Sequence, residues 1–227
     1  TMFTNGEYLD ADRALRLKQT GLYGVFVSLA HADPARHDAN RGRPGLFEKA
    51  AAAIGHCRHA GLPVGISTYV TKAKLAGGEI EAILELGRRF EVLEVFIFDV
   101  TPSGRLTGDF ESVLDAGEVA RMQELRLRYA DRPEYPRIVH QTLFSSLAYP
   151  CVADGCPAAL VQLHVRADGD VAPCDFTPVA FGNVRREPLA AIWRAMTHHP
   201  LYAAPSPRCR LASADFHAEL TGAVPGA

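Results

Sequence analysis

The amino-acid sequence predicts an α/β fold in which a partial parallel (β/α) barrel, or an open parallel sheet, is followed by a small module of one hairpin and one helix. Two observations carry this prediction. Strand-like and helix-like segments alternate over residues 1–143, and four of the five cysteines lie between residues 151 and 209. A composition of 48% hydrophobic and 22% charged residues is typical of a globular protein with its own core.

Each expected strand is a short apolar run, and each expected helix carries apolar side chains three or four residues apart. Glycines close the helices, as Gly21 and Gly61 do after the first two. The polar residues between the second strand and the second helix, 31–42, are expected to form a loop. The expected strands cover residues 1–6 (the tail of a strand), 24–30, 63–70, 93–100 and, more weakly, 137–143, and the expected helices cover residues 9–19, 46–59, 78–90 and 110–129.

Strands that alternate with helices pair in parallel through right-handed crossovers, so their carboxyl ends meet at one edge of the sheet. Ligands of such sheets and barrels bind at that edge. The residues expected there are Thr4, Asn5 and Gly6, residues 28–31, 68–71 and 99–105, and Gln141 and Thr142.

The C-terminal module is predicted from a hairpin pattern. An alternating apolar run at residues 160–165, a turn at Asp168-Gly169 and a second apolar run that leads into Cys174 are typical of two antiparallel strands. A short amphipathic helix is expected over residues 187–196. The predicted domains are residues 1–148 and residues 149–227.

Four cysteines belong to this module, separated by four, seventeen and thirty-four residues: Cys151, Cys156, Cys174 and Cys209. They lack the paired C-x2-C knuckles of common zinc sites, so zinc is less favoured, whereas iron–sulfur clusters tolerate irregular spacing. Disulfides are a third alternative, although no secretory signal is visible, and four unrelated buried residues are a fourth. The fifth cysteine, Cys57, lies within an expected helix and is expected to be a core or groove residue.

Beyond these patterns, the sequence resembles a known family. The segments Thr4-Asn5-Gly6, GVFVSLA, AGLPVGISTYVTK and FIFDVTPSGR are similar to successive βα units of a radical S-adenosylmethionine (radical SAM) enzyme. The stretch GCPAALVQLHVRADGDVAPCDF, with the FGNV and PLAAIW that follow it, resembles the C-terminal SPASM/twitch module that holds an auxiliary iron–sulfur cluster. The resemblance covers essentially the whole chain.

The resemblance implies a barrel of the radical SAM type and, for the full-length parent, S-adenosylmethionine as cofactor. It further implies 5′-deoxyadenosyl-radical chemistry on a peptide or a cofactor precursor, with an electron donor such as a ferredoxin or flavodoxin. The auxiliary cluster would be of the 4Fe-4S or 2Fe-2S type. The positions that match the family's cofactor contacts are Asn5, Gly6, Ser28, Thr68, Asp99 and Pro102, and those that match its cluster ligands are Cys156 and Cys174, then Cys209, and least closely Cys151.

One departure from the family bears directly on activity. Radical SAM enzymes hold their radical-generating cluster with a CxxxCxxC motif, and these 227 residues contain none. The chain is therefore expected to be a fragment that is inactive by itself. Two alternatives stay open: a non-catalytic scaffold that binds a peptide or a cofactor, and a structural zinc protein in which the cysteines only stabilise the C-terminal module.

Other polar residues have plainer expected roles. His31, Asp33 and His37 are expected to lie in a solvated polar loop. The acidic residues of the helix at 78–90 are expected to form its solvated face: Glu79, Glu81 and Glu85. A net charge of -2 gives no electrostatic case for binding nucleic acid or an anionic membrane surface, and no apolar run reaches the length of a membrane span. We therefore expect a cytoplasmic protein.

Overall fold

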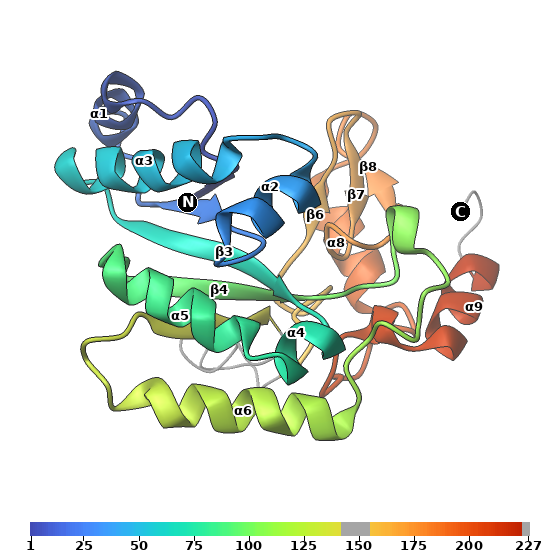
Figure 1. The fold of residues 1–227 in the computed structure, drawn as a ribbon. Helices are drawn as coiled ribbons and strands as arrows, with labels where there is room; N and C mark the ends of the chain where they lie inside the picture. Colours follow the sequence, from blue (N-terminus) through green and yellow to red (C-terminus); the bar gives the residue numbers. More distant parts are fainter. Residues whose placement is uncertain (142–154, 224–227) are drawn as a thin grey trace. The chain divides into compact units, whose positions relative to one another are not determined.

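A computed structural model describes residues 1–141 and 155–223 of the chain (Figure 1). These residues form two compact units. The first unit comprises residues 1–100 and 114–141, and the second comprises residues 101–113 with the described part of residues 142–227. Cys151 and Thr142, both named from the sequence, lie outside the described residues.

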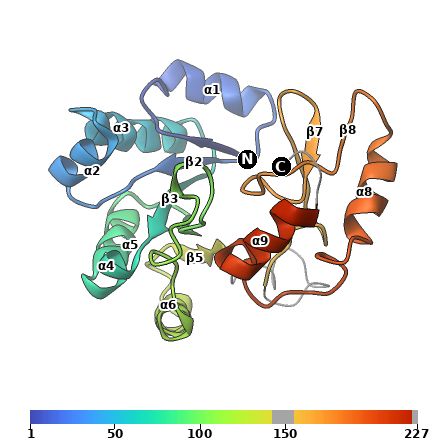
Figure 2. The same ribbon diagram turned by 90° about the vertical axis from the view of Figure 1, so that its right-hand side faces the viewer.

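The first unit is built on a five-stranded parallel sheet whose strands are neighbours in the order of the chain: β1 (Met2–Thr4), β2 (Val25–Ser28), β3 (Val64–Val70), β4 (Glu94–Asp99) and β5 (Arg137–His140). Successive strands are joined through α1 (Ala11–Gln19), α3 (Leu46–His59), α5 (Glu79–Arg89) and α6 (Ala116–Ala130), which surround the sheet on its outer side (Figure 2). Because each right-handed crossover steps to the next strand in the same direction, the connecting helices all cover one face. This is barrel topology, and the predicted fold class is confirmed.

The core of the first unit lies between the sheet and these helices. Strand residues alternate between the two faces of a sheet, and the helix-facing set is aliphatic. Val27, Ile66 and Ile97 from three neighbouring strands have no exposed surface and pack against the buried side chains of α3 and α5, such as Ile54 and Ile83. Burial of this continuous apolar layer is the main stabilising term for the unit.

The other face of the sheet carries aromatic side chains. Phe3 on β1 stacks on Phe26 of β2, with ring centroids 4.8 Å apart, and meets Phe96 and Phe98 of β4 edge-on at 5.8 and 5.6 Å. Phe3 is 47% exposed. Aromatic rings in such stacked and edge-on pairs attract one another beyond the area that they bury, so the sheet keeps an ordered apolar inner face.

The second unit contains the predicted hairpin and helix. β6 (His164–Val165), β7 (Asp170–Ala172) and β8 (Gly182–Asn183) form a three-stranded antiparallel sheet. Two helices follow, α8 (Leu189–Thr197) and α9 (Ala214–Ala223). Buried side chains from both helices and the loops between them, including Met196, Tyr202 and Leu220, form a separate core.

Three α-helices were not predicted, and one of them is α9 of the second unit. Residues 31–42, expected to be a loop, contain α2 (Pro34–Arg41), which Asp33 caps by accepting a hydrogen bond from the Arg36 amide at 2.8 Å. Asp before Pro is a standard helix start, so the signal was present in the sequence. Another missed helix is α4 (Lys72–Ala76). The helix expected over 110–129 begins only at Ala116, after a capping box formed by Asp115 and Glu118.

The longest described helix, α6, has 15 residues. In the parts of the chain that the structure describes, none of the helices has the length and apolar character needed to cross a membrane.

We predict that Gly65→Ala destabilises the first unit. A Cβ at this position of β3 would lie 2.7 Å from the Phe26 ring and 2.8 Å from the carbonyl oxygen of Glu94, both closer than van der Waals contact. Such overpacking costs about 1–3 kcal/mol. Urea unfolding followed by circular dichroism should therefore show a lower midpoint.

Gly55→Ala is the matched control, because Gly55 lies within α3 and a Cβ there has no neighbour within 4 Å. Alanine in a helix is favoured over glycine by about 0.5–1 kcal/mol, so this variant should be more stable than the parent. Equal midpoints for the two variants would contradict the close approach at Gly65.

Candidate cofactor and cluster sites

Two serine hydroxyls meet at the carboxyl ends of β2 and β3. Ser28, expected to contact a cofactor, pairs in register with Ser67, and their Oγ atoms lie 2.9 Å apart. Each alternates along its strand with residues of the helix-facing core, so both lie on the aromatic face with Phe26. Sequence reasoning missed Ser67, although its place one residue before Thr68 puts it on the face opposite to that residue. Together the hydroxyls can donate to and accept from a polar ligand.

The turn after β1 is held against α3. Gly6 has a φ of +79°, and a Cβ there would lie 3.0 Å from the Cα of Ala50. Only glycine suits both the conformation and the contact. The side chain of Asn5 accepts a hydrogen bond from the Glu7 amide at 3.1 Å and so closes the same turn.

The other expected cofactor contacts do not gather with Ser28. Thr68 alternates with Ser67 and is buried on the helix-facing side, beside the core residues Ile66 and Val70. Asp99, at the end of β4, accepts a hydrogen bond from His140 Nε2 at 2.9 Å. Pro102 belongs to the second unit. The sheet therefore brings Ser28 and Ser67 together on one face and places Thr68 on the other.

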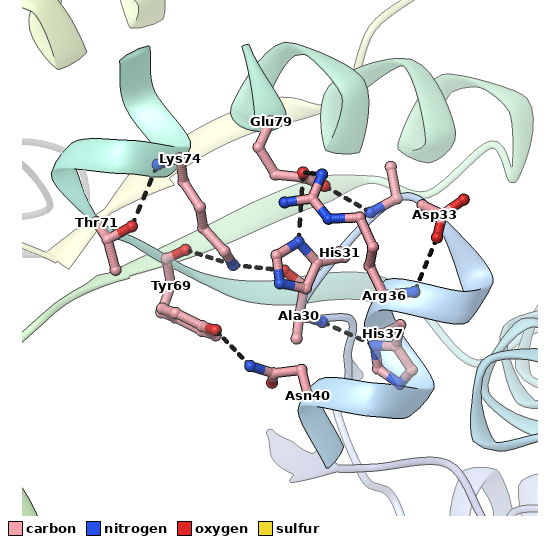
Figure 3. A network of polar contacts seen from close by, with 11 residues as sticks. Ala30, His31, Asp33, Arg36, His37, Asn40, Tyr69, Thr71, Lys74 and Glu79 are labelled. Carbon is pink, nitrogen blue, oxygen red and sulfur yellow. Dashed lines mark hydrogen bonds and ion pairs between the residues drawn. The ribbon is translucent and has the colours of Figure 1, made fainter. Parts of the chain in front are cut away.

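A buried lysine joins the carboxyl ends of β2 and β3 (Figure 3). The Nζ of Lys74, on α4, donates to the carbonyl oxygens of Ala30 and of Tyr69, the latter at 3.2 Å, and lies 3.4 Å from the centroid of the Tyr69 ring. Lys74 is only 6% exposed. Burial lowers its pKa to about 8, although the carboxylate of Glu79 acts in the opposite direction.

The loop after β2 is fixed from both sides by side chains. The Ala30 amide donates to His37 Nδ1 at 3.0 Å, and the Ala32 amide donates to Glu79 Oε1 at 2.8 Å. Arg36 and His31 also contact the Glu79 carboxylate, at 2.8 and 3.3 Å (Figure 3). Burial tends to raise the pKa of Glu79, but these partners hold it below its ordinary value.

These contacts correct three expectations. His31 and His37 do not lie in a solvated loop: both are buried, and burial lowers the pKa of His37. Glu79 is not on a solvated helix face, because it is 7% exposed and binds a loop amide 47 residues away in sequence. The network therefore rigidifies the backbone next to Ser28.

Three of the four expected cluster ligands lie around one core in the second unit. Cys156, Cys174 and Cys209 are each partly buried and pack against its apolar side chains. Burial raises the pKa of the Cys174 thiol, and the nearby Cys156 adds to that effect. Cys57 is fully buried in the first unit, where burial raises its pKa to about 11, so the expectation of a core residue is confirmed.

A glycine brings the segments of Cys156 and Cys209 together. The Cys156 amide donates to the carbonyl oxygen of Ser206 at 2.9 Å. A Cβ on Gly155 would lie 2.2 Å from that oxygen and 3.1 Å from the Cα of Pro207. The backbones on the N-terminal side of the two cysteines can therefore approach only because residue 155 is glycine.

The side chain of Asn183 holds together the hairpin that leads to Cys174. Its Nδ2 donates to Asp170 Oδ1 at 2.8 Å, and its Oδ1 accepts from the Arg185 amide at 2.9 Å. Gly169 leaves room for this side chain, since a Cβ there would lie 2.8 Å from Asn183 Oδ1. These contacts explain why the sequence pairs a DG turn with a GN-x-R motif fourteen residues later.

The donor set suits an iron–sulfur cluster. Thiolates are the ligands of such clusters, and the apolar core around the three cysteines limits access of water. Among the described residues, no three His, Cys, Asp or Glu side chains converge as the ligands of a single metal ion. A cluster contains several iron atoms, so its thiolates do not need to meet at one point.

A family model described as an iron–sulfur cluster-binding SPASM domain matches residues 156–210. Among curated proteins, the chain is 29% identical over 215 residues to an AdoMet-dependent heme synthase of Nitratidesulfovibrio vulgaris and 30% identical over 206 residues to one of Methanosarcina barkeri. These alignments cover 87% and 84% of this chain and 58% of each relative. A PqqA peptide cyclase of Streptomyces rochei is 29% identical over 86% of this chain and 54% of its own.

Solved structures share the fold. A crystal structure of Streptococcus suis SuiB bound to its precursor peptide SuiA matches 90% of this chain and 49% of its own, with a TM-score of 0.65 and 16% identity. The native anSMEcpe with bound AdoMet matches 88% and 57%, with a TM-score of 0.62 and 15% identity. The chain thus spans about half to three fifths of the length of the proteins that it matches.

Lys74→Met should flatten the pH dependence of the free energy of unfolding. The folded pKa of about 8 lies below the value of about 10.4 expected for an unfolded lysine. Between these pH values the unfolded chain binds more protons than the folded chain, so stability rises with pH, by up to about 3 kcal/mol. Removing the amine removes this rise.

The matched control is Lys72→Met, because the Lys72 side chain, two positions earlier in α4, is 44% exposed. Urea unfolding at several pH values between about 8 and 10 measures the slope. If Lys74→Met kept the same slope of the free energy of unfolding against pH as the parent and the control, this result would contradict the buried position of the Lys74 amine.

Proposed function

We propose that the chain belongs to the radical SAM enzymes that carry a SPASM domain, that its first unit contacts S-adenosylmethionine, and that its second unit holds an auxiliary iron–sulfur cluster. The observation that carries the proposal is the packing of Cys156, Cys174 and Cys209 around one core within the segment that matches the SPASM model. S-adenosylmethionine bound at a reduced cluster supplies radical hydrogen-abstraction chemistry in this family. These 227 residues contain no CxxxCxxC motif, so we assign none of them a part in generating the radical.

For the auxiliary cluster, we assign Cys156, Cys174 and Cys209 as three ligands and Cys151 as the fourth. The chemistry of the donors supports this set, since four thiolates hold a 4Fe-4S or a 2Fe-2S cluster. Cys156, Cys174 and Cys209 share one core, and the close approach of Gly155 to Ser206 joins the segments of Cys156 and Cys209. The domain boundary near residue 148 follows from the same assignment.

For S-adenosylmethionine, the best supported contact is the hydroxyl of Ser28. It lies at the carboxyl edge of a parallel sheet, pairs with Ser67, and is next to a loop that Lys74, His37 and Glu79 hold rigid. A rigid backbone lowers the entropy cost of binding a ligand. The other residues named from the sequence stay proposed contacts: Asn5, Gly6, Asp99 and Pro102, and Thr68 through its backbone, since its side chain is buried on the helix-facing side.

The proposed substrate of the whole protein is a peptide or a cofactor precursor. Both classes occur among the similar proteins: two heme synthases, a PqqA peptide cyclase, and SuiB with its precursor peptide. The aromatic inner face of the sheet, with Phe3 half exposed, would suit an apolar part of either. A ferredoxin or flavodoxin is the proposed electron donor.

We predict that Cys174→Ala abolishes the cluster while the first unit keeps its fold. After anaerobic reconstitution with iron and sulfide, the parent chain should retain both elements in similar amounts, and the variant should retain little of either. The measurement is iron and sulfide per chain, with circular dichroism as the test of folding.

Cys57→Ala is the control, since Cys57 lies in the core of the first unit and should leave the cluster intact. Full iron and sulfide in Cys174→Ala would show that Cys174 is not a ligand. One zinc per parent chain, without iron or sulfide, would replace the cluster by a structural zinc site.

A further inference from the structure

The turn that follows Cys174 places a hydroxyl beside its sulfur. The Oγ1 of Thr177 lies 3.1 Å from Cys174 Sγ, within hydrogen-bond distance. The Thr177 amide donates to the Cys174 carbonyl oxygen at 3.3 Å and closes the turn. A hydrogen bond donated to the sulfur favours the thiolate, whereas burial raises the pKa of the thiol.

Thr177 is itself buried. The residue is 2% exposed, so its hydroxyl has little contact with solvent and depends on partners within the protein. The sulfur of Cys174 is such a partner.

The direction of this bond follows from the chemistry of the two groups. A thiolate that binds iron can only accept hydrogen bonds. Thr177 therefore donates its hydroxyl hydrogen to Cys174 when a cluster is bound. In a buried site of low dielectric constant such a bond is stronger than it would be in water.

The threonine is held in place by a further contact. Arg166, directly after β6, donates to the Thr177 carbonyl oxygen at 2.6 Å. The position of the hydroxyl beside the sulfur is thus fixed before any cluster binds.

Hydrogen bonds to cluster sulfurs help to set the reduction potential, because they stabilise the more negative, reduced state. We propose that the hydrogen bond from the Thr177 hydroxyl raises the reduction potential of the cluster bound through Cys174. This inference rests on the proposed cluster function. It names Thr177 as a positioning residue that acts through a ligand and is not a ligand itself.

The test is the midpoint potential of the reconstituted cluster in the 227-residue chain, measured by redox titration with electron paramagnetic resonance. These residues contain no CxxxCxxC motif, so the auxiliary cluster is measured alone. Thr177→Val removes the hydroxyl at nearly constant volume and should lower the potential. Thr177→Ser keeps the hydroxyl and should retain the parent value.

The matched control is Thr197→Val on α8, where the threonine hydroxyl donates to the Arg194 carbonyl oxygen at 3.2 Å. It should leave the potential unchanged. A full complement of iron and sulfide in Thr177→Val with the potential of the parent would overturn the role of the Thr177 hydroxyl and leave the proposed function standing. If Thr177→Val fails to hold a cluster, Thr177→Ala, which also lacks the hydroxyl, decides: an unchanged potential in that variant overturns the same role. Absence of iron and sulfide from the parent chain would overturn the proposed function itself.

Discussion

Parallel pairing of strands in the order of the chain is the constraint on which the first unit depends. Each crossover advances to the next strand in the same direction, so α1, α3, α5 and α6 must all cover one face of the sheet. The opposite face is then left to the rings of Phe3, Phe26, Phe96 and Phe98, and the carboxyl ends of the strands share one edge. The hydroxyl pair of Ser28 and Ser67 occurs at that edge as a direct consequence of the register between β2 and β3.

The second unit must hold thiols from distant parts of the sequence near one another. Its sheet is too small to do so by itself, since β6 and β8 have two residues each. Close backbone approach at Gly155 and the hydrogen bonds of Asn183 provide what the sheet lacks. The apolar core around Met196 and Tyr202 then keeps water away from the sulfur atoms.

The sequence predicted those features that arise from local patterns. The helix at 46–59 was predicted to its last residue, because its apolar spacing and the closing Gly61 are local signals. The hairpin before Cys174 was predicted from its turn. The network around Lys74 could not be predicted in this way, because the partner of Glu79 is the backbone amide of Ala32, and only folding brings the two together. From the sequence alone, a glutamate at this position of the helix cannot be distinguished from one whose carboxylate faces water.

The same distinction applies to the candidate site: some of its residues could be found from the sequence, and others only from contacts in the folded protein. The cysteines and Ser28 stood out by residue type and by resemblance to the radical SAM family. Ser67 and Thr177 did not, since serine and threonine are common residues whose importance here comes from a single contact each. The wrong expectation for residues 31–42 has another cause: the Asp33-Pro34 helix start was outweighed by the polar composition of the segment.

The central claim is that the cysteines of the second unit hold an iron–sulfur cluster, and iron X-ray absorption spectroscopy of the anaerobically reconstituted chain tests it most directly. The account predicts that iron is coordinated by sulfur and has other iron atoms as near neighbours. Iron surrounded only by oxygen or nitrogen ligands, with no neighbouring iron, would contradict it.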